Sequence, residues 1–188
     1  FRNGKGKITY SNRQRHYYDG DWNKDKRHGE GIYYDGNYNY DGKWSNDLKH
    51  GEGILKSNGD RYYGKWINNE MQGIFIISYS NGDKYNGEVN SYGERHGKGF
   101  FKYSKYRENN SFEEKYDYYE GQWENNIKKG KGFMKFKNSD IYDGEWSNNL
   151  RNGQGELKKY GPLCYYVGKW SEGWKKSCGI MQPYTCCS

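Results

Sequence analysis

The chain has 188 residues and a formal net charge of +7, and 32% of its residues are hydrophobic. So few aliphatic side chains exclude a thick core, but 22 Tyr and 7 Trp can build a thin one, because each aromatic ring buries a large area. No apolar run approaches the roughly 20 residues of a membrane-spanning helix, and none has the character of the apolar h-region of a secretory signal. At this length we expect one domain.

A five-residue motif, Tyr-x-Gly-x-Trp, recurs along the chain at a nearly fixed period. Fixed-period self-similarity predicts a repeat architecture in which each unit buries its apolar face against its neighbours. Such arrays bind or scaffold more often than they catalyse. The complete copies begin at Tyr18, Tyr40, Tyr62, Tyr119, Tyr142 and Tyr166, and a copy beginning at Tyr85 has lost its Trp.

A second motif, Gly-x-Gly, follows most copies of the first after a polar turn, and three of its copies are preceded by His. Asn-Gly pairs such as Asn58-Gly59 come later in the unit, and Asn-Gly between alternating segments is a strong hairpin signal. We therefore expect one β-hairpin per repeat. The Gly-x-Gly copies begin at Gly29, Gly51, Gly97, Gly130 and Gly153.

Strand parity assigns the two faces, because successive side chains point to opposite sides of a strand. Tyr40, Gly42 and Trp44 share one face, and Gly51 and Gly53 lie on one face of the partner strand. Glycine weakens a strand, so its recurrence indicates that it leaves room for the rings. One column of the array is apolar throughout and consists of Tyr33, Leu55, Ile77, Phe101, Met134 and Leu157. We predict an all-β fold: an elongated, single-layer antiparallel sheet of stacked hairpins, twisted, with one concave groove.

The repeats divide the chain into five segments. About ten extra residues separate the fourth and fifth repeats, and insertions in repeat proteins map to loops. The segments are a partial N-terminal repeat (1–17), repeats one to four (18–103), an inserted polar loop (104–118), repeats five and six (119–165), and a degenerate C-terminal repeat or cap with a cysteine-containing tail (166–188).

Tyr-x-Gly-x-Trp, the polar turn, His-Gly-x-Gly and a later Asn-Gly-Asp together resemble the MORN repeat (membrane occupation and recognition nexus). The resemblance covers roughly residues 18–170, and Val89 and Phe75 depart from it. It implies stacked β-hairpins. It also implies an accessory role, because MORN arrays occur in membrane-junction proteins, lipid kinases, a lysine methyltransferase, axonemal proteins and cell-division scaffolds. Some arrays are linked to acidic phospholipids and others to helical peptides in a groove.

The aromatic stripe is the first candidate binding surface. A single-layer sheet is not expected to bury it fully, so exposed ring edges would seat a helix or extended peptide of a partner. The first hypothesis is therefore a non-catalytic protein-interaction scaffold that binds a partner protein segment along an aromatic groove. The candidate residues are Tyr40, Trp44, Tyr62, Trp66, Trp123, Tyr142 and Trp146.

The basic surplus supplies the second candidate surface. Residues 95–188 carry 17 Lys and Arg against 11 Asp and Glu, whereas residues 1–94 carry 14 against 13. Interleaved cations and aromatics suit an anionic phospholipid such as a phosphoinositide, although a solvated face is the plainer interpretation. The alternatives are thus a membrane tether and a regulatory module of a larger enzyme such as a lipid kinase. The anion-binding candidates are Lys98, Phe100, Lys102, Lys128, Lys129, Lys131, Phe133, Lys135 and Lys137.

No pattern predicts enzymatic chemistry or a cofactor. Gly-x-Gly lacks the remaining residues of a phosphate loop. His28, His50 and His96 occupy equivalent repeat positions, about 10 Å apart in neighbouring units, which is too far for one zinc ion. Turn hydrogen bonding is the better explanation for them. His16 has no evident partner.

Four cysteines lie near the C-terminal end and are interpreted as ordinary free thiols, with zinc binding, a disulfide and lipid attachment as alternatives. Their absence from the repeats favours a reducing compartment, so we expect a cytoplasmic protein, peripheral to a membrane or to the cytoskeleton. A protein partner is expected and nucleic acid is not, because acids interrupt nearly every strand. A homodimer through the C-terminal end is a further hypothesis. The cysteines are Cys164, Cys178, Cys186 and Cys187.

Overall fold

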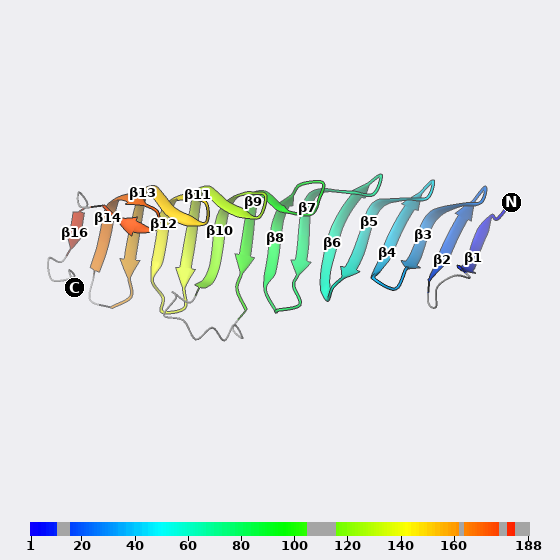
Figure 1. Cartoon of the computed structure of the whole chain (residues 1–188), viewed down its shortest axis with the longest axis horizontal. Helices are drawn as coiled ribbons and strands as arrows, with labels where there is room; N and C mark the ends of the chain where they lie inside the picture. Colours follow the sequence, from blue (N-terminus) through cyan, green and yellow to red (C-terminus); the bar gives the residue numbers. More distant parts are fainter. Residues whose placement is uncertain (11–15, 105–115, 162–163, 177–179, 183–188) are drawn as a thin grey trace. The chain divides into compact units, whose positions relative to one another are not determined.

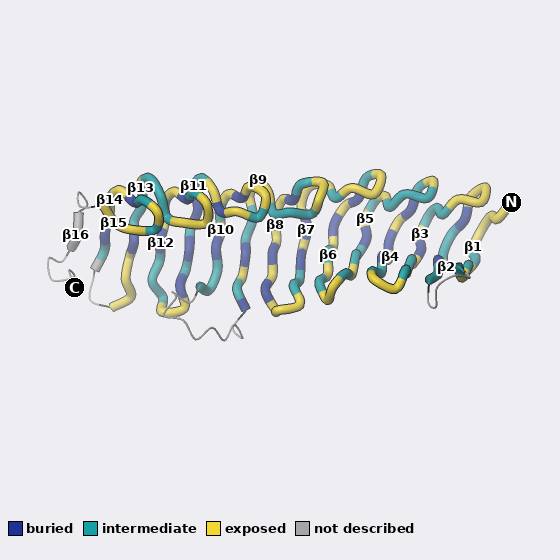
Figure 2. Tube along the Cα trace, viewed as in Figure 1, coloured by how far each residue is buried: buried dark blue, intermediate teal, exposed yellow. Residues whose placement is uncertain are grey.

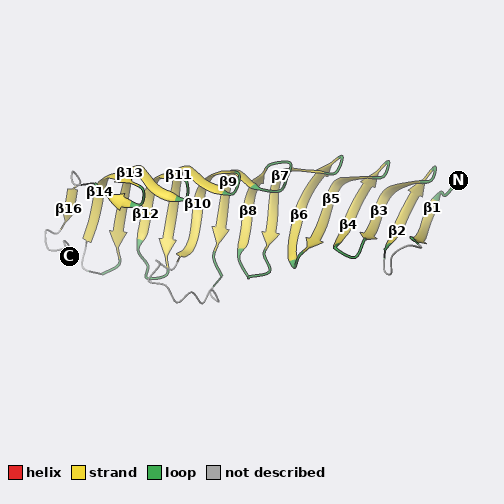
Figure 3. Ribbon diagram, viewed as in Figure 1, coloured by secondary structure: helices red, strands yellow, loops and turns green. Residues whose placement is uncertain are grey.

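The structure is a computed structural model that describes residues 1–10, 16–104, 116–161, 164–176 and 180–182 (Figure 1). These ranges contain strands and turns but no helix, as Figure 3 shows. A helix with the length and apolar character needed to cross a membrane is accordingly not found in the described part of the chain.

The strands pair antiparallel in chain order from β1 to β15, and β16 pairs with β14. This order confirms the predicted all-β sheet of stacked hairpins. The strands are β1 (Gly4–Thr9), β2 (Tyr17–Asn23), β3 (Lys26–Tyr34), β4 (Tyr38–Ser45), β5 (Leu48–Ser57), β6 (Asp60–Ile67), β7 (Glu70–Ser78), β8 (Lys84–Val89), β9 (Arg95–Lys102), β10 (Tyr116–Glu124), β11 (Ile127–Phe136), β12 (Ile141–Ser147), β13 (Leu150–Lys159), β14 (Cys164–Ser171), β15 (Trp174–Lys175) and β16 (Ile180–Gln182).

Two compact units make up the chain, whereas its length alone predicts one domain. Unit 1 comprises Phe1–Ser80 and Glu88–Glu94, and unit 2 comprises Asn81–Gly87 and Arg95–Ser188. Each unit is described by itself below.

Two-residue turns with left-handed backbone close the hairpins. Asn46 and Asp47 have φ of 50° and 70°, and the flanking residues Ser45 and Leu48 pair directly. Both central residues of a type I′ turn need positive φ, and Asn and Asp tolerate it best after glycine. The same pair of positive φ values recurs at Lys24-Asp25, Asn68-Asn69, Asn125-Asn126 and Asn148-Asn149.

Each of these hairpins also contains a bulge of two extra residues. Gly42 pairs with Gly53 and Trp44 pairs with Lys49, so three residues of β5 stand opposite Lys43 alone. The middle one, Gly51, has φ of 73°, which glycine adopts without strain. Two extra residues preserve strand parity, so the face assignment made from the sequence holds on both sides of the bulge.

Within each unit the tyrosine and tryptophan rings form an edge-to-face ladder on one face of the sheet, called the ring face from here on. The buried Tyr40 ring meets Trp44 of its own strand at 5.2 Å and Trp66 of β6 at 5.5 Å, close to perpendicular in both cases. Such pairs add about 0.5–1.5 kcal/mol each beyond area burial. Buried positions therefore follow the strands, while the turns are mostly exposed (Figure 2). The predicted apolar column lies on this face, with Ile77, Phe101, Met134 and Leu157 buried and Tyr33 and Leu55 half-buried.

Glycine makes the ladder possible, as the recurrence of glycine predicted. A Cβ atom on Gly53 would lie 2.5 Å from Cζ of Tyr40, inside its van der Waals surface. The Tyr40 hydroxyl instead passes over the bare backbone and donates a hydrogen bond to the carbonyl oxygen of Lys43 at 3.1 Å. The ring is buried and its polar group is satisfied.

The third repeat solves the same packing problem with a different residue. Phe75 replaces a glycine of the Gly-x-Gly motif, is fully buried and packs against Trp66 at 5.7 Å. Its ring occupies the space beside Gly64 where a tyrosine lies in the other repeats. Tyr62 is consequently only half-buried, and its hydroxyl donates to Asp60 at 3.3 Å. The departure from the motif is thus a local repacking.

The inserted loop predicted at residues 104–118 ends earlier in the structure, because β10 begins at Tyr116. Tyr116 to Tyr118 already belong to β10, and the backbone N–H of Tyr103 donates to the carbonyl of Asp117 at 2.9 Å. Residues 105–115, the remainder of that prediction, lie outside the described residues.

Candidate interaction surfaces

Each indole of the ring face is held by a hydrogen bond to the preceding hairpin. Nε1–H of Trp44 donates to the carbonyl oxygen of Gly31 at 2.9 Å. The polar group of the ring is therefore satisfied within the sheet. Equivalent bonds join Trp22 to Gly6, Trp66 to Gly53, Trp123 to Gly99, Trp146 to Gly132 and Trp170 to Gly155.

A cation lies over each of these six indoles. The Arg27 guanidinium lies 4.2 Å from the centroid of Trp44, and its Nε–H donates to the Asp47 carboxylate at 3.2 Å. The sequence analysis missed this ladder, although Arg or Lys stands two residues before the first glycine of each Gly-x-Gly motif and Met71 takes its place in the third repeat. The other pairs are Arg2 with Trp22, Lys49 with Trp66, Arg95 with Trp123, Lys128 with Trp146 and Arg151 with Trp170.

The expectation that ring edges remain exposed is wrong. Trp44, Trp66, Trp123 and Trp146 are 5%, 2%, 4% and 5% exposed. Neighbouring rings cover one side of each indole and the cation covers the other, so a single layer does bury them. Of the predicted stripe, Tyr40 and Tyr142 are also buried and only Tyr62 is half-buried.

Burial on the ring face also shifts protonation equilibria. Loss of solvation raises the pKa of Tyr18 and of Tyr62 to about 12, and it raises the pKa of Tyr40 further. The same cause lowers the pKa of Lys49 below its usual value. These shifts are those of a closed core, in which the neutral forms are favoured.

Lys128 does not lie with the other candidate lysines. Its side chain is 5% exposed, and its Nζ lies 4.5 Å from the Trp146 centroid on the ring face. The sequence contains the signal, because residue 128 has the strand parity of Gly130 and Met134 rather than that of Lys131.

The opposite face of the sheet, called the second face from here on, brings together part of the predicted anion-binding set in unit 2. Phe100 of β9 lies 5.2 Å from Tyr118, and Phe133 of β11 stacks on the other side of Tyr118 at 5.9 Å. Lys102 and Lys135 pair with Tyr118 from the two flanking strands. Sequence reasoning missed Tyr118 because it fell inside the predicted loop.

The remaining lysines of that set have other neighbours. Lys129 forms an ion pair with Glu124, and Nζ of Lys137 donates to the carbonyl of Ser104 at 3.4 Å. Lys98 and Lys131 belong to another row of the second face, opposite Gln122 and Glu145 respectively.

In unit 1 the second face carries an exposed apolar row that the sequence analysis did not identify. Ile54 pairs with Tyr63, and Tyr63 pairs with Ile76, so three neighbouring strands present apolar side chains side by side. Ile32 continues the row beyond Asp41. Ile32, Tyr63 and Ile76 are 36%, 46% and 50% exposed. Ile32, Ile54, Tyr63 and Ile76 are together called the apolar row from here on.

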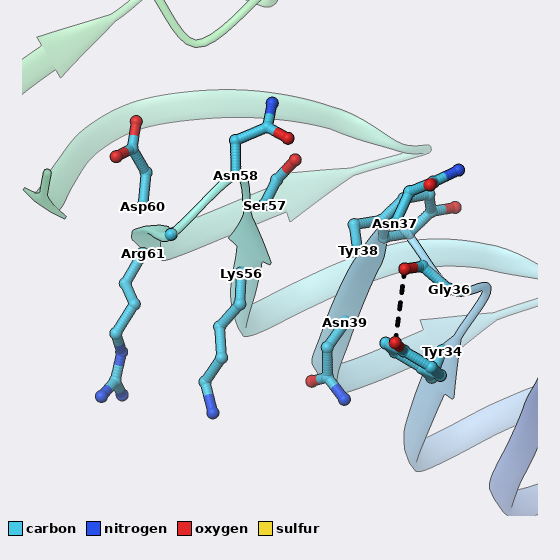
Figure 4. Close-up of a pocket in the computed structure, with 11 residues that line it drawn as sticks. Tyr34, Gly36, Asn37, Tyr38, Asn39, Lys56, Ser57, Asn58, Asp60 and Arg61 are labelled. Carbon is cyan, nitrogen blue, oxygen red and sulfur yellow. Dashed lines mark hydrogen bonds between the residues drawn. The ribbon is translucent and has the colours of Figure 1, made fainter. Parts of the chain in front are cut away.

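Figure 4 shows an open pocket of about 430 Å³ in unit 1 between the turns near Gly36 and Gly59. Lys56 and Arg61 pair directly and point the same way, whereas Asp60 points away from them. The Asp60 carboxylate accepts a hydrogen bond from the Ser80 N–H at 2.8 Å. Neither cation pairs with an acidic side chain of the described residues, so the pocket has a basic rim.

The histidines and cysteines do not converge within the described ranges. No group of three His, Cys, Asp or Glu side chains there could hold a metal ion. His50 and His96 are exposed, and His16, for which sequence suggested no partner, lies 2.8 Å from the Tyr33 hydroxyl through Nε2. The zinc hypothesis rests on the side chains of Cys164, Cys178, Cys186 and Cys187, which lie outside the described part of the structure.

Comparison with known families agrees with the hairpin geometry. The family model described as MORN repeat matches residues 1–15, 18–39, 40–61, 85–106, 119–141 and 142–159, which is more than half of the chain. No curated protein matches it. The matched segments from residue 18 onward contain the ring and glycine positions described above, and the chain belongs to the MORN repeat family.

Proposed function

We propose that this chain is a non-enzymatic protein-interaction module whose binding surface is the second face of the sheet. MORN repeats are in general non-catalytic and suggest a protein- or membrane-interaction module. The observation that carries the proposal is the apolar row of unit 1, in which Tyr63 and Ile76 are about half exposed on adjacent strands.

The two faces differ in what they offer a partner. The ring face has satisfied indole N–H groups and cation-covered rings, so little apolar surface remains on it. The apolar row is unbroken from Ile54 to Ile76, Asp41 separates Ile32 from it, and its side chains are partly in water. The neighbouring positions Lys43, Glu52 and Lys65 are polar. A contiguous exposed apolar patch with a polar rim is typical of a protein-binding site. The proposed surface therefore replaces the aromatic groove.

Site-specific crosslinking tests the proposal. A benzoylphenylalanine residue at Tyr63 should form an adduct with a second protein in cell extract, and one at Tyr92 should not. Tyr92 is 88% exposed and also belongs to unit 1, so it controls for exposure alone. Adding Ile54→Ser and Ile76→Ser should abolish the Tyr63 adduct while circular dichroism stays unchanged, because both side chains are only partly buried. Equal adducts from the two positions would refute the proposal, and adducts of twice the chain mass would identify a second copy as the occupant.

An anionic membrane is the second candidate function, favoured by the Phe100, Tyr118 and Phe133 cluster between Lys102 and Lys135. Aromatic rings among lysines suit an anionic headgroup layer. Flotation with phosphatidylserine vesicles should then fall several-fold when both lysines become Glu, and an unchanged floated fraction removes this candidate.

A further inference from the structure

The second face of unit 2 separates charge by row. One row crosses β9 to β14 through directly paired residues and contains no acidic side chain among the residues described. The adjoining row, two residues away along each strand, contains Glu120, Asp143 and Glu156. The acid-free row, named the basic row, consists of Lys102, Tyr118, Lys135, Ile141, Lys158 and Tyr165.

The lysines of the basic row stand on alternate strands. Lys102 is on β9, Lys135 on β11 and Lys158 on β13, with an aromatic or aliphatic side chain between successive cations. Paired strands are about 4.8 Å apart, so successive lysines recur about every 9.6 Å across the sheet. A ligand that meets all three needs negative charges at that spacing on one of its sides.

Helical periodicity matches this spacing and extended periodicity does not. Seven residues of an α-helix advance about 10.5 Å and return to nearly the same side. Three residues of an extended chain also advance about 10 Å, but they place the first and fourth side chains on opposite sides. Lysine side chains are long enough to absorb the difference of about 1 Å between helix and sheet.

We propose that the basic row binds an acidic amphipathic helix of a partner protein, which crosses β9 to β13 with Glu or Asp side chains seven residues apart facing Lys102, Lys135 and Lys158. This inference rests on the proposed protein-interaction function and names its partner in unit 2. The two rows are about 6.6 Å apart, less than the width of a helix of about 10 Å, so a helix covers both. Its other edge therefore meets Glu120, Asp143 and Glu156 and carries basic or apolar residues.

The state of the lysines supports this occupant. Lys102 and Lys135 form no ion pair with a described acidic residue, and Lys158 pairs with Glu156 at 3.3 Å on a solvent-exposed surface. An exposed pair of this kind is weak and can exchange its acidic partner for another. Tyr118 and Ile141 lie between the cations and supply apolar contact for the helix. Because the lysines bind it through charge, added salt should weaken the complex.

Two synthetic helical peptides of identical composition test the inference by fluorescence anisotropy. One carries Glu at i, i+7 and i+14, and the other carries the same three Glu at i, i+5 and i+10, spread around the helix. The first should bind the full chain at least about tenfold more tightly, because only it aligns all three charges with the row. Equal affinities overturn the inference.

Matched chain variants locate the contact. The triple variant Lys102→Glu, Lys135→Glu and Lys158→Glu should weaken binding of the aligned peptide by at least about tenfold. Reversal of Lys98, Lys131 and Lys169 changes the net charge equally in another row of the same face, and it should leave affinity within about twofold. A peptide with Lys in place of the three aligned Glu should recover binding to the first variant. Equal losses in both variants, or no recovery, overturn the inference.

Two further measurements, vesicle flotation and the Tyr63 crosslink in unit 1, separate the remaining explanations. If the basic-row variant loses flotation on phosphatidylserine vesicles while peptide binding is unaffected, the occupant is a membrane and the inference fails. If neither peptide binds but the Tyr63 crosslink persists, the acidic helix is wrong and the protein-interaction function stands. If the chain with no substitution beyond the Tyr63 probe forms no crosslink, the protein-interaction function is refuted instead.

Discussion

The indole of Trp44 donates its Nε1–H to the carbonyl oxygen of Gly31 at 2.9 Å, across the boundary between two successive hairpins. The same ring lies edge-to-face against Tyr18 of the preceding repeat at 5.5 Å. Polar and apolar contacts of one side chain thus join neighbouring repeats, and the Tyr18 ring fits beneath Trp44 because Gly31 has no side chain: a Cβ there would lie 2.5 Å from Cζ of Tyr18. A chain with few aliphatic residues obtains its core in this way.

Gly53→Ala should lower the free energy of unfolding by about 1–3 kcal/mol, because the added methyl group overlaps the Tyr40 ring and forces it out of place. Gly6→Ala is the matched control, since a Cβ there meets the Trp22 indole at an ordinary 3.5 Å. Urea denaturation followed by tryptophan fluorescence measures both. Equal losses for the two variants would contradict the nesting of rings over glycine.

Lys128→Glu should destabilise the chain by at least about 2 kcal/mol, because it removes a desolvated cation from the Trp146 ring and buries a carboxylate against aromatic faces. Lys131→Gln, three residues away on the second face, should change the same quantity by less than about 0.5 kcal/mol. Lys128→Met should lie between them, because Met71 occupies the equivalent position naturally. The midpoint of thermal unfolding ranks the three variants. If Lys128→Glu leaves this midpoint unchanged, the side chain at position 128 lies in water and the account of the ring face is wrong.

Stability should fall as pH rises from about 10 to 12. Burial raises the pKa of Tyr18 and Tyr62 to about 12, whereas tyrosines of the unfolded chain ionise near pH 10. Between these values the unfolded state binds fewer protons than the folded state, so ΔG of unfolding decreases with pH. The contribution is complete below pH 10 and is lost as pH passes the folded pKa.

Urea midpoints measured from pH 8 to pH 12 test this dependence. Tyr18→Phe should make the midpoint less sensitive to alkali, because one of the raised groups is removed. A midpoint that stays constant to pH 12 would show that these hydroxyls are solvated.

The fold was predictable from the sequence because its period, its glycines and its turn residues all indicate the same hairpin. Parity assigned Tyr40 and Trp44 to one face correctly, and the apolar column ending at Leu157 is confirmed. The bulges were not foreseen, but they insert two residues and leave parity intact. The motif shows Phe75 where a glycine is expected, but that its ring takes the place of the nested tyrosine depends on three-dimensional packing.

The candidate surfaces were less predictable, because exposure depends on what covers a side chain. The motif identifies Trp44 as aromatic but not that Arg27, from the preceding repeat, covers it. Likewise, the cluster around Tyr118 depends on β10 beginning at Tyr116, inside a segment whose polar composition predicts a loop. Pairing across strands also creates the apolar row, since Ile54 and Ile76 lie 22 positions apart in the sequence.

Hydroxyl-radical footprinting of β6 tests the central claim most directly, because Tyr63 and Trp66 of this one strand lie on opposite faces. In the free chain we predict oxidation of Tyr63 and protection of Trp66, which is 2% exposed. With the crosslinked partner bound, Tyr63 should become protected as well. Oxidation of Trp66 in the free chain, followed by its selective protection in the complex, would contradict the account and return the binding surface to the ring face.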